Sequence, residues 1–361
     1  MQRAPEPKTR LGHYKVLGAH AGVRVSPICL GAMNFGTEWE GMLGKCDKFE
    51  AFKILDTFYD AGGNFIDTAD NYQNGQSEQW IGEWMQKRNN REEMVIATKF
   101  TSPLTPQNKD GIWINHAGNS RKNLKIAVER SLKNLETDYI DLLYVHWWDY
   151  TTSVEEVMQS LNQLVLSGKV LYLGVSDTPA WIVSAANTYA KAHNLAPFVV
   201  YQGKWNVEER DLERDIIPMV KHFGMAIAPW SVLGAGRYKK DEAPAREGTP
   251  FFKKHDTHDA MVSALDSIAA ELNATRMQVC IAYVIKKYPL TFPILGGRKA
   301  EYLKDNIAAL ELVEKLTQAH VETLEKTGPI DLGFPHNFVG NGKYEDNFLL
   351  GMSGKLEQVR I

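Results

Sequence analysis

Short apolar runs and amphipathic helical patterns alternate along most of this 361-residue chain. The apolar runs lie at residues 28–31, 64–67, 94–99, 140–146, 171–176, 198–202, 225–229 and 292–295. Between them, apolar side chains recur at helical spacing in residues 47–59, 77–87, 124–135, 153–165, 180–192, 211–223, 259–272 and 277–287, with a last helix from Lys299. The pattern predicts eight buried strands separated by helices.

A doubly wound sheet would fit this alternation, but eight evenly spaced apolar strands favour a (β/α)8 TIM barrel. Residues 14–17 and 23–26 flank a Gly-containing turn and predict an N-terminal β-hairpin. A long polar loop, residues 231–256, follows the seventh strand. We expect a loosely ordered arm at residues 1–10, the barrel at 11–327 and a C-terminal tail at 328–361.

The predicted strands end on polar or small residues, although their interiors are almost wholly apolar. The ends are Gly31, Asp67, Lys99, His146, Ser176, Gln202, Trp230 and Gly296. Taken singly, each has an ordinary explanation: Asp67 could cap a turn, Lys99 could reach the surface and His146 could be a satisfied core histidine. A barrel gathers these ends around one mouth, where active sites of this fold lie. The set therefore indicates a catalytic site.

Asp67, Tyr72, Lys99 and His146 make chemical sense together. A phenol has a pKa near ~10, and lowering it to about 7 takes about 4 kcal/mol. One ammonium at about 4 Å supplies that much at an effective dielectric near 20. We expect Lys99 to lower the pKa of Tyr72, Asp67 to hold Lys99, and His146 to orient a carbonyl. These residues can protonate a carbonyl oxygen, but the hydride must come from a cofactor.

The composition of the chain limits the binding partners, metal sites and cellular location that can be expected. The chain is 44% hydrophobic with a net charge of −3, so no nucleic-acid or membrane-binding face is expected. No apolar run reaches the ~18 residues of a membrane span, and the first ten residues do not resemble a secretory signal. Cys29, Cys46 and Cys280 lack metal spacing, which predicts reduced thiols, no metal site and a cytoplasmic location. Oligomeric state is left open between monomer and homo-oligomer.

Several motifs identify the family that this chain resembles. They are Gly-Gly-Asn-Phe-Ile-Asp-Thr-Ala (62–69), His-Trp-Trp-Asp-Tyr (146–150), Gly-Lys-Val-Leu-Tyr-Leu-Gly-Val-Ser-Asp-Thr-Pro-Ala-Trp (168–181) and Phe-Pro-Ile-Leu-Gly-Gly-Arg-Lys (292–299). Together with Asp67, Tyr72, Lys99 and His146, hereafter the tetrad, these motifs resemble those of the aldo-keto reductases. More narrowly, they resemble the fungal aryl-alcohol dehydrogenases and the norsolorinic acid reductase-like proteins. The resemblance covers residues 11–314.

The resemblance implies NADP(H) bound across the barrel mouth without a Rossmann fold. Ser176, Asp177 and Gln202 would hold the carboxamide, although Asp177 replaces the asparagine of many members. Trp205 would stack on the nicotinamide, and Arg298 would bind the 2′-phosphate. The other expected cofactor residues are Gly31, Ala32, Met33, Asp67, Trp230, Ser231, Leu233, Gly234, Gly236, Arg237, Gly296, Gly297, Asp305 and Asn306.

The substrate side is expected to be aromatic, because Trp39, Trp113, Trp147 and Trp148 lie in loops near the mouth beside Tyr72 and His146. The leading hypothesis is an NADPH-dependent reductase of aromatic aldehydes or ketones, with a polyketide-type ketone of fungal secondary metabolism as the alternative substrate. A nicotinamide-binding sensor subunit is a further alternative. A glycosidase is excluded, since it would need paired carboxylates. The tail and residues 101–118 could each cover the pocket or lie on the surface.

Overall fold

The computed structural model describes residues 3–238, 255–340 and 347–355. In these ranges, eight parallel strands pair in the order β10–β3–β4–β5–β6–β7–β8–β9. They are β3 (Cys29–Gly31), β4 (Phe65–Asp67), β5 (Val95–Phe100), β6 (Ile140–Val145), β7 (Val170–Ser176), β8 (Phe198–Lys204), β9 (Ala226–Trp230) and β10 (Ile294–Gly296). A bridge between Ile227 and Thr291 brings the two edges together. The predicted (β/α)8 barrel is confirmed.

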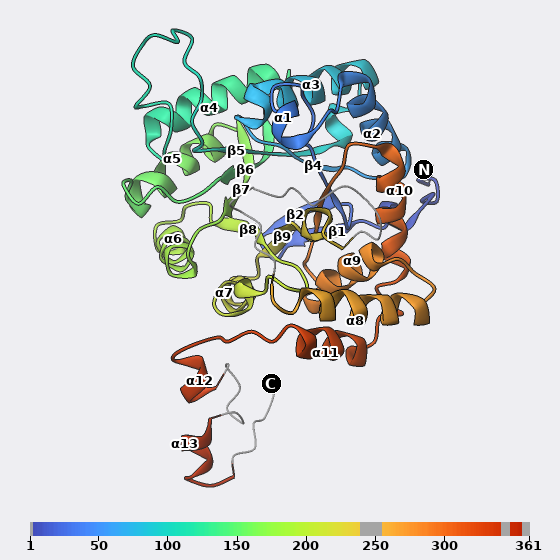
Figure 1. The fold of residues 1–361 in the computed structure, drawn as a ribbon. Coiled ribbons are helices and arrows are strands. Elements are labelled where there is room, and N and C mark those ends of the chain that lie inside the picture. Colours follow the sequence, from blue (N-terminus) through green and yellow to red (C-terminus); the bar gives the residue numbers. More distant parts are fainter. Residues whose placement is uncertain (1–2, 239–254, 341–346, 356–361) are drawn as a thin grey trace.

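Figure 1 looks along the barrel axis, with the helices in a ring around the strands. The ring consists of α2 (Lys48–Asp60), α3 (Gln76–Arg88), α4 (Arg121–Asn134), α5 (Val154–Leu166), α6 (Ala180–Ala192), α7 (Ile216–His222), α8 (His258–Glu271), α9 (Arg276–Lys287) and α10 (Ala300–Ala308). The predicted helix at 211–223 is divided into a 3-10 turn, η4 (Asp211–Glu213), and α7. The short helix α1 (Glu40–Leu43) precedes α2. The helices of the ring pack their apolar faces on the strands, which are therefore buried on both faces.

Side chains alternate between the barrel interior and the helix layer along each strand. On β5, Val95 and Ala97 belong to the interior cluster, whereas Ile96 packs among the helices. On β6, Leu142 and Tyr144 face inward in the same way. Since the strand period is two, the next inward positions are those of Lys99 and His146. Alternation therefore aims these polar side chains at the mouth.

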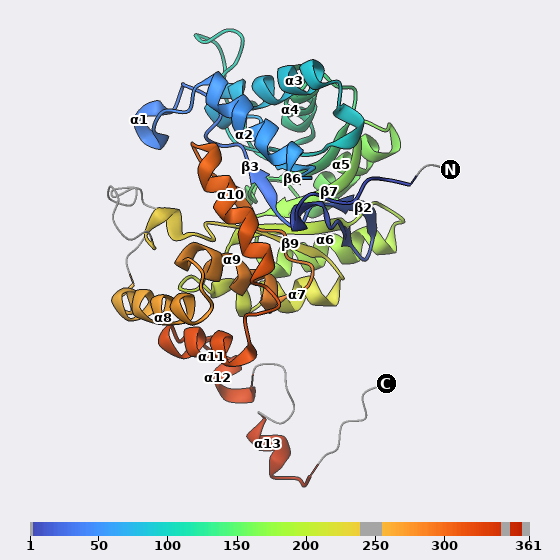
Figure 2. The same cartoon turned by 90° about the vertical axis from the view of Figure 1, so that its right-hand side faces the viewer.

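The N-terminal hairpin closes the end of the barrel opposite the mouth. β1 (Lys15–Gly18) pairs antiparallel with β2 (Ala21–Val25), as predicted. Leu17 and Val25 are fully buried in the interior cluster, and the Ala19 amide donates to the Gly224 carbonyl at 3.0 Å. Figure 2 shows the hairpin on one side of the barrel and α1 on the other. The hairpin therefore fills the amino-terminal end of the barrel, away from the carboxyl ends of the strands, where active sites of this fold lie.

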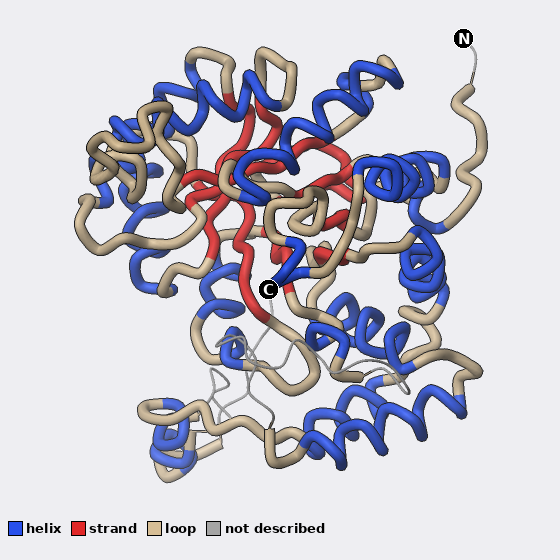
Figure 3. The backbone as a smooth tube through the Cα atoms, turned by 45° about the horizontal axis from the view of Figure 1, so that its top comes forward, coloured by secondary structure: helices blue, strands red, loops and turns tan. Residues whose placement is uncertain are grey.

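The C-terminal region forms a helix that the sequence analysis does not predict, α11 (Gln318–Thr327), followed by two four-residue helices, α12 (His336–Val339) and α13 (Phe348–Gly351). Val321 and Leu324 of α11 are buried in the outer core. Beyond α11, the Arg214 guanidinium donates to the Leu332 carbonyl at 2.9 Å. Figure 1 shows α12 outside the ring of helices, and Figure 3 shows the strands, in red, gathered inside the helices, in blue. None of the helices in the described ranges has the length and apolar character to cross a membrane.

Candidate active site

Lys99 is fully buried at the end of β5, and its ammonium uses all three of its hydrogens. Nζ donates to Asp67 Oδ1 at 2.6 Å, to the Thr68 carbonyl at 2.7 Å and to the Tyr72 hydroxyl at 3.3 Å. Because the Tyr72 oxygen accepts this bond, its own hydrogen is left to point elsewhere. Burial lowers the pKa of Lys99, but Asp67 and Tyr72 outweigh it and raise it to about 12. The ammonium therefore stays charged.

Asp67 ends β4 and has both carboxylate oxygens engaged. Oδ1 accepts from Lys99, and Oδ2 accepts from Gln202 Nε2 at 2.9 Å. Burial raises the pKa of Asp67, while Lys99 and Gln202 act in the opposite direction. Gln202 was expected to hold a cofactor carboxamide; in the structure its Nε2 supports the buried ion pair.

Tyr72 stands at the start of the 3-10 turn η2 (Tyr72–Gly75), half-buried in the mouth. Gln73, in the same turn, is buried and donates from Nε2 to the Met33 carbonyl at 3.1 Å, while its Oε1 accepts from the Trp39 amide at 2.7 Å. The turn is thus anchored to the loop after β3. Burial raises the pKa of Tyr72, and Lys99 only partly opposes this. The expectation that Lys99 lowers the pKa of Tyr72 below its usual value is therefore wrong: the phenol stays protonated.

His146 follows β6 directly and lies beside Tyr72. The ring centroids are 5.8 Å apart and nearly perpendicular. The His146 amide donates to the Phe100 carbonyl at 3.0 Å, and Nδ1 lies 3.2 Å from Ser102 Oγ. Burial, together with the Lys99 charge, holds the pKa of His146 well below its usual value. The imidazole is therefore neutral.

The structure adds polar residues that the sequence analysis misses. Thr101, with φ of +118°, donates from Oγ1 to Asn119 Oδ1 at 2.8 Å. Asn119 Nδ2 in turn donates to the Trp147 carbonyl at 3.2 Å. A β-branched residue in this backbone region is strained, which is common near functional sites. These residues give no periodic or motif signal, because they act through contacts between loops.

Ser176 and Asp177 lie at the end of β7. The Ser176 hydroxyl donates to Asp177 Oδ2 at 3.2 Å, and Trp230 Nε1 donates to Asp177 Oδ1 at 3.2 Å. Asp177 is exposed and, in the described chain, forms no ion pair; its φ is +42°. Although the residue as a whole is exposed, desolvation of its carboxylate raises the pKa of Asp177 to about 6, and the hydrogen bonds from Trp230 and Ser176 oppose this rise. Trp230, at the end of β9, is half-buried at the same mouth.

Trp205 does not fit the role of a stacking residue. Its side chain is fully buried, and Nε1 donates to Glu213 Oε1 at 3.1 Å, beneath the loop between β8 and α7. A ring without exposed surface cannot lie against a ligand. Trp230, which was expected only as a cofactor contact, is the tryptophan that reaches the mouth at these strand ends.

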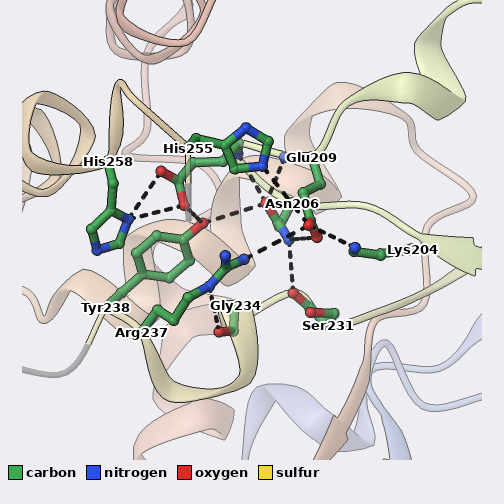
Figure 4. A network of polar contacts seen from close by, with 10 residues as sticks. Lys204, Asn206, Glu209, Ser231, Gly234, Arg237, Tyr238, His255 and His258 are labelled. Carbon is green, nitrogen blue, oxygen red and sulfur yellow. Dashed lines mark hydrogen bonds and ion pairs between the residues drawn. The ribbon is translucent and has the colours of Figure 1, made fainter. Parts of the chain in front are cut away.

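The loop after β9 is held by residues that follow β8 (Figure 4). Asn206 Nδ2 donates to the Ser231 carbonyl at 3.0 Å, and Arg237 Nε donates to the Gly234 carbonyl at 3.0 Å. The Glu209 carboxylate accepts from Lys204 at 2.6 Å and lies 3.9 Å from Arg237. Beyond residues 239–254, which are outside the described ranges, His258 Nδ1 lies 3.0 Å from Glu208. Both ends of the long loop are thus tied to residues 204–209, while Leu233 and Gly236 lie between these contacts and hydrogen-bond to each other.

The remaining predicted cofactor residues lie at the ends of β3 and β10 and on α10. Gly31 ends β3 beside β10, which ends at Gly296, and Ala32 and Met33 follow β3. After Gly297, Arg298 is exposed and lies over Gly44, where its Nη1 occupies the space that a Cβ would take. On α10, Asp305 accepts from Gln278 Nε2 at 2.8 Å, and Asn306 is buried.

The four predicted substrate tryptophans have different positions. Trp39 packs edge-on against Tyr72, with ring centroids 6.2 Å apart, and Trp147 donates from Nε1 to Ser102 Oγ at 3.2 Å. Trp148 is only 8% exposed and belongs to the outer core. Trp113 lies in the loop after β5, where its Nε1 donates to the Lys109 carbonyl at 3.0 Å. The structure therefore brings Trp39 and Trp147 next to the tetrad, whereas Trp148 supports the fold.

Comparison with known proteins agrees with this geometry. The chain matches the Aldo/keto reductase family over residues 27–328. It is 52% identical to a norsolorinic acid reductase of Aspergillus flavus, over 93% of this chain and 86% of that protein. It is 51% identical to a putative aryl-alcohol dehydrogenase of Saccharomyces cerevisiae, over 93% and 92%. It is also 48% identical to an aryl-alcohol dehydrogenase of Pestalotiopsis microspora, over 98% and 93%.

The family match covers most of the chain, and three relatives are near 50% identical along almost their whole length. The barrel and the buried lysine–carboxylate pair beside a phenol agree with it. The chain belongs to the aldo/keto reductase family and is an oxidoreductase that acts on carbonyl or alcohol groups.

Proposed function

We propose that this enzyme reduces aromatic aldehydes or ketones with NADPH and, in reverse, oxidises aryl alcohols. One observation carries the proposal: the buried Lys99 ammonium donates to the Tyr72 hydroxyl oxygen while it is held by Asp67. This arrangement leaves the phenol hydrogen free for a carbonyl oxygen, with neutral His146 beside it.

The protein's part in the reaction is to position and protonate the carbonyl. When bound, the reduced nicotinamide would supply the hydride. As charge develops on the carbonyl oxygen, Tyr72 donates its proton, and the Lys99 charge next to it stabilises the phenolate that results. His146 hydrogen-bonds the same oxygen and fixes its direction. In the reverse reaction, the Tyr72 phenolate accepts the alcohol proton.

The residues of the mouth fit a phosphorylated dinucleotide. Ser231 Oγ, at the start of the loop after β9, is buried and has no hydrogen-bond partner in the described ranges, which leaves a donor for a phosphate oxygen. Arg298 is exposed and makes no ion pair with a described residue, as a 2′-phosphate site requires. Ser176 and Asp177 would meet the carboxamide, Trp230 would stack on the nicotinamide ring, and Asp305 and Asn306 would lie near the adenine.

The substrate class rests on aromatic residues and on the relatives. Trp39 and Trp147 lie around Tyr72 and offer flat apolar surface. The relatives in yeast and Pestalotiopsis are named aryl-alcohol dehydrogenases, which supports small aromatic aldehydes. The Aspergillus relative is named norsolorinic acid reductase, which supports a second candidate, a larger polyketide-type aromatic ketone. A cytosolic location is proposed from the three free cysteines.

The test is the decay of NADPH absorbance with veratraldehyde, for the wild type beside Tyr72→Phe. We expect turnover in the wild type and at least a hundredfold loss in the variant, with the Kd for NADPH nearly unchanged. Tyr189→Phe, which removes a phenol on α6, is the matched control. If NADPH binds but no small aldehyde is reduced, bulky aromatic ketones are assayed next. If neither class is reduced, the protein is a dinucleotide-binding sensor and the proposal fails.

A further inference from the structure

Ser102 lies behind His146, next to the ring nitrogen Nδ1. Its hydroxyl oxygen is 3.2 Å from His146 Nδ1 and 3.2 Å from Trp147 Nε1. The residue is only 6% exposed. Across the described parts of the chain, the Ser102 hydroxyl has no other hydrogen-bond partner.

The Ser102 hydroxyl has a single hydrogen, and this determines the direction of its hydrogen bonds with Trp147 Nε1 and His146 Nδ1. An indole N–H can only donate, so the Ser102 oxygen accepts from Trp147. If His146 Nδ1 also donated, the hydroxyl would accept twice and its own hydrogen would be buried without an acceptor, which is costly. The favourable arrangement has the hydroxyl donating to Nδ1. A neutral imidazole that accepts at Nδ1 carries its hydrogen on Nε2.

The backbone around Ser102 keeps this geometry fixed. The preceding residue, Thr101, is in a strained conformation and bonds through Oγ1 to Asn119, which also holds the Trp147 carbonyl. The His146 amide lies 3.3 Å from Thr101 Oγ1 and donates to it. The serine, the indole and the imidazole therefore sit in one cage formed by the loops after β5 and β6.

We infer that Ser102, supported by Trp147, sets the Nε2–H tautomer of His146 and so makes it a hydrogen-bond donor toward the substrate oxygen. The inference rests on the proposed function, because a donor is what a carbonyl needs. The opposite tautomer would turn an Nε2 lone pair toward the carbonyl lone pairs and repel it. Ser102 is a positioning residue, since it acts through His146.

The tautomer is measured directly by NMR. The full chain is labelled with 15N-histidine, without cofactor or substrate, and long-range 1H–15N correlations of His146 are assigned by their loss in His146→Gln. We expect a proton on Nε2 in the wild type and in Ser102→Thr, and a mixture of tautomers in Ser102→Ala. A proton on Nδ1 in the wild type, or an unchanged tautomer in Ser102→Ala, would overturn the inference. If Ser102→Ala does not fold, Trp147→Phe replaces it and is expected to give a mixture too.

Turnover provides the second readout. Ser102→Ala should lower kcat for veratraldehyde roughly tenfold without changing the Kd for NADPH, and Ser102→Thr should restore it. A loss of kcat in Ser102→Ala with the wild-type tautomer retained would contradict the inference. If the wild type reduces no carbonyl but shows the Nε2–H signal that Ser102→Ala loses, the tautomer assignment stands and the proposed function fails.

Discussion

Gln202 Nε2 donates a hydrogen bond to Asp67 Oδ2 at 2.9 Å, although the two residues are 135 positions apart and lie on strands that are not neighbours in the sheet. The contact therefore crosses the barrel interior. Lys99 occupies the other carboxylate oxygen, so the buried Asp67 has a partner on each side. Gln202 thereby holds the carboxylate that holds the ammonium beside Tyr72.

Replacing Gln202 by methionine tests this support. Gln202→Met keeps the approximate shape but leaves one buried oxygen of Asp67 without a donor, which should lower the free energy of unfolding by about 1–3 kcal/mol. Urea unfolding measures the loss. Gln159→Met is the matched control, because Gln159 donates to Tyr189 at an exposed site and should cost less than about 0.5 kcal/mol. An equal loss of unfolding free energy in the two variants would show that the hydrogen bond to Asp67 contributes no more to stability than the exposed one.

The pH dependence of the two directions should differ. Burial raises the pKa of Tyr72, so the phenol remains protonated through neutral pH and the rate of reduction should be flat from about pH 6 to 9. Alcohol oxidation needs the phenolate and should rise about tenfold per pH unit across the alkaline range. Because the pKa of His146 is well below its usual value, no acid limb is expected near pH 6.5. The measurement is the profile of kcat/KM from pH 6 to 10. A fall in kcat/KM toward the acid end of that range would contradict a neutral His146.

Arg298 is expected to distinguish the phosphorylated cofactor. Arg298→Ala removes a charge-assisted contact and should weaken NADPH binding about ten- to a hundredfold while leaving NADH within about threefold. Fluorescence titration gives both Kd values. Lys299→Ala is the control, since it removes an exposed charge of the same sign one residue further on. An equal loss of affinity for NADPH and NADH would show that Arg298 does not bind the 2′-phosphate.

Asp177 should favour the oxidised cofactor, because NADP⁺ carries a ring charge that NADPH lacks and the carboxylate forms no ion pair with a described residue. In Asp177→Asn, the preference for NADP⁺ over NADPH should fall by roughly tenfold. With a pKa of about 6, wild-type Asp177 is ionised at pH 8 and protonated at pH 5, so the wild type should lose the same preference as pH falls. Asp211→Asn removes an equal charge from an exposed site and should change nothing. An unchanged ratio in Asp177→Asn would refute the charge effect.

The two tryptophans near the ends of β8 and β9 should respond differently to substitution. Trp230→Ala removes a half-buried ring at the mouth and should weaken NADPH roughly tenfold with little effect on stability. Trp205→Phe breaks the buried bond to Glu213 and should reduce stability while cofactor affinity is retained. Urea unfolding and NADPH titration of both variants separate the effects. The reverse outcome would restore Trp205 as the stacking residue.

Much of the fold, and the positions of Asp67, Lys99 and His146 at strand ends, could be predicted from the sequence because they depend on local periodicity. Strands that are buried on both faces are continuous apolar runs, and their period of two aims alternate side chains inward. Val95, Ala97 and Lys99 follow one such line into the mouth. Polar residues at the ends of apolar runs therefore indicate the site from the sequence alone.

Only the tertiary structure decided what depends on contacts between distant loops. The sequence could not show that Trp205 is covered by the segment before α7 while Trp230 stays open, since both residues follow apolar strands. It gave no sign of Gln202 reaching Asp67, or of Ser102 meeting His146. Periodicity determines which face of its own strand a side chain occupies, whereas partners across the barrel depend on the closure of the sheet and the paths of its loops.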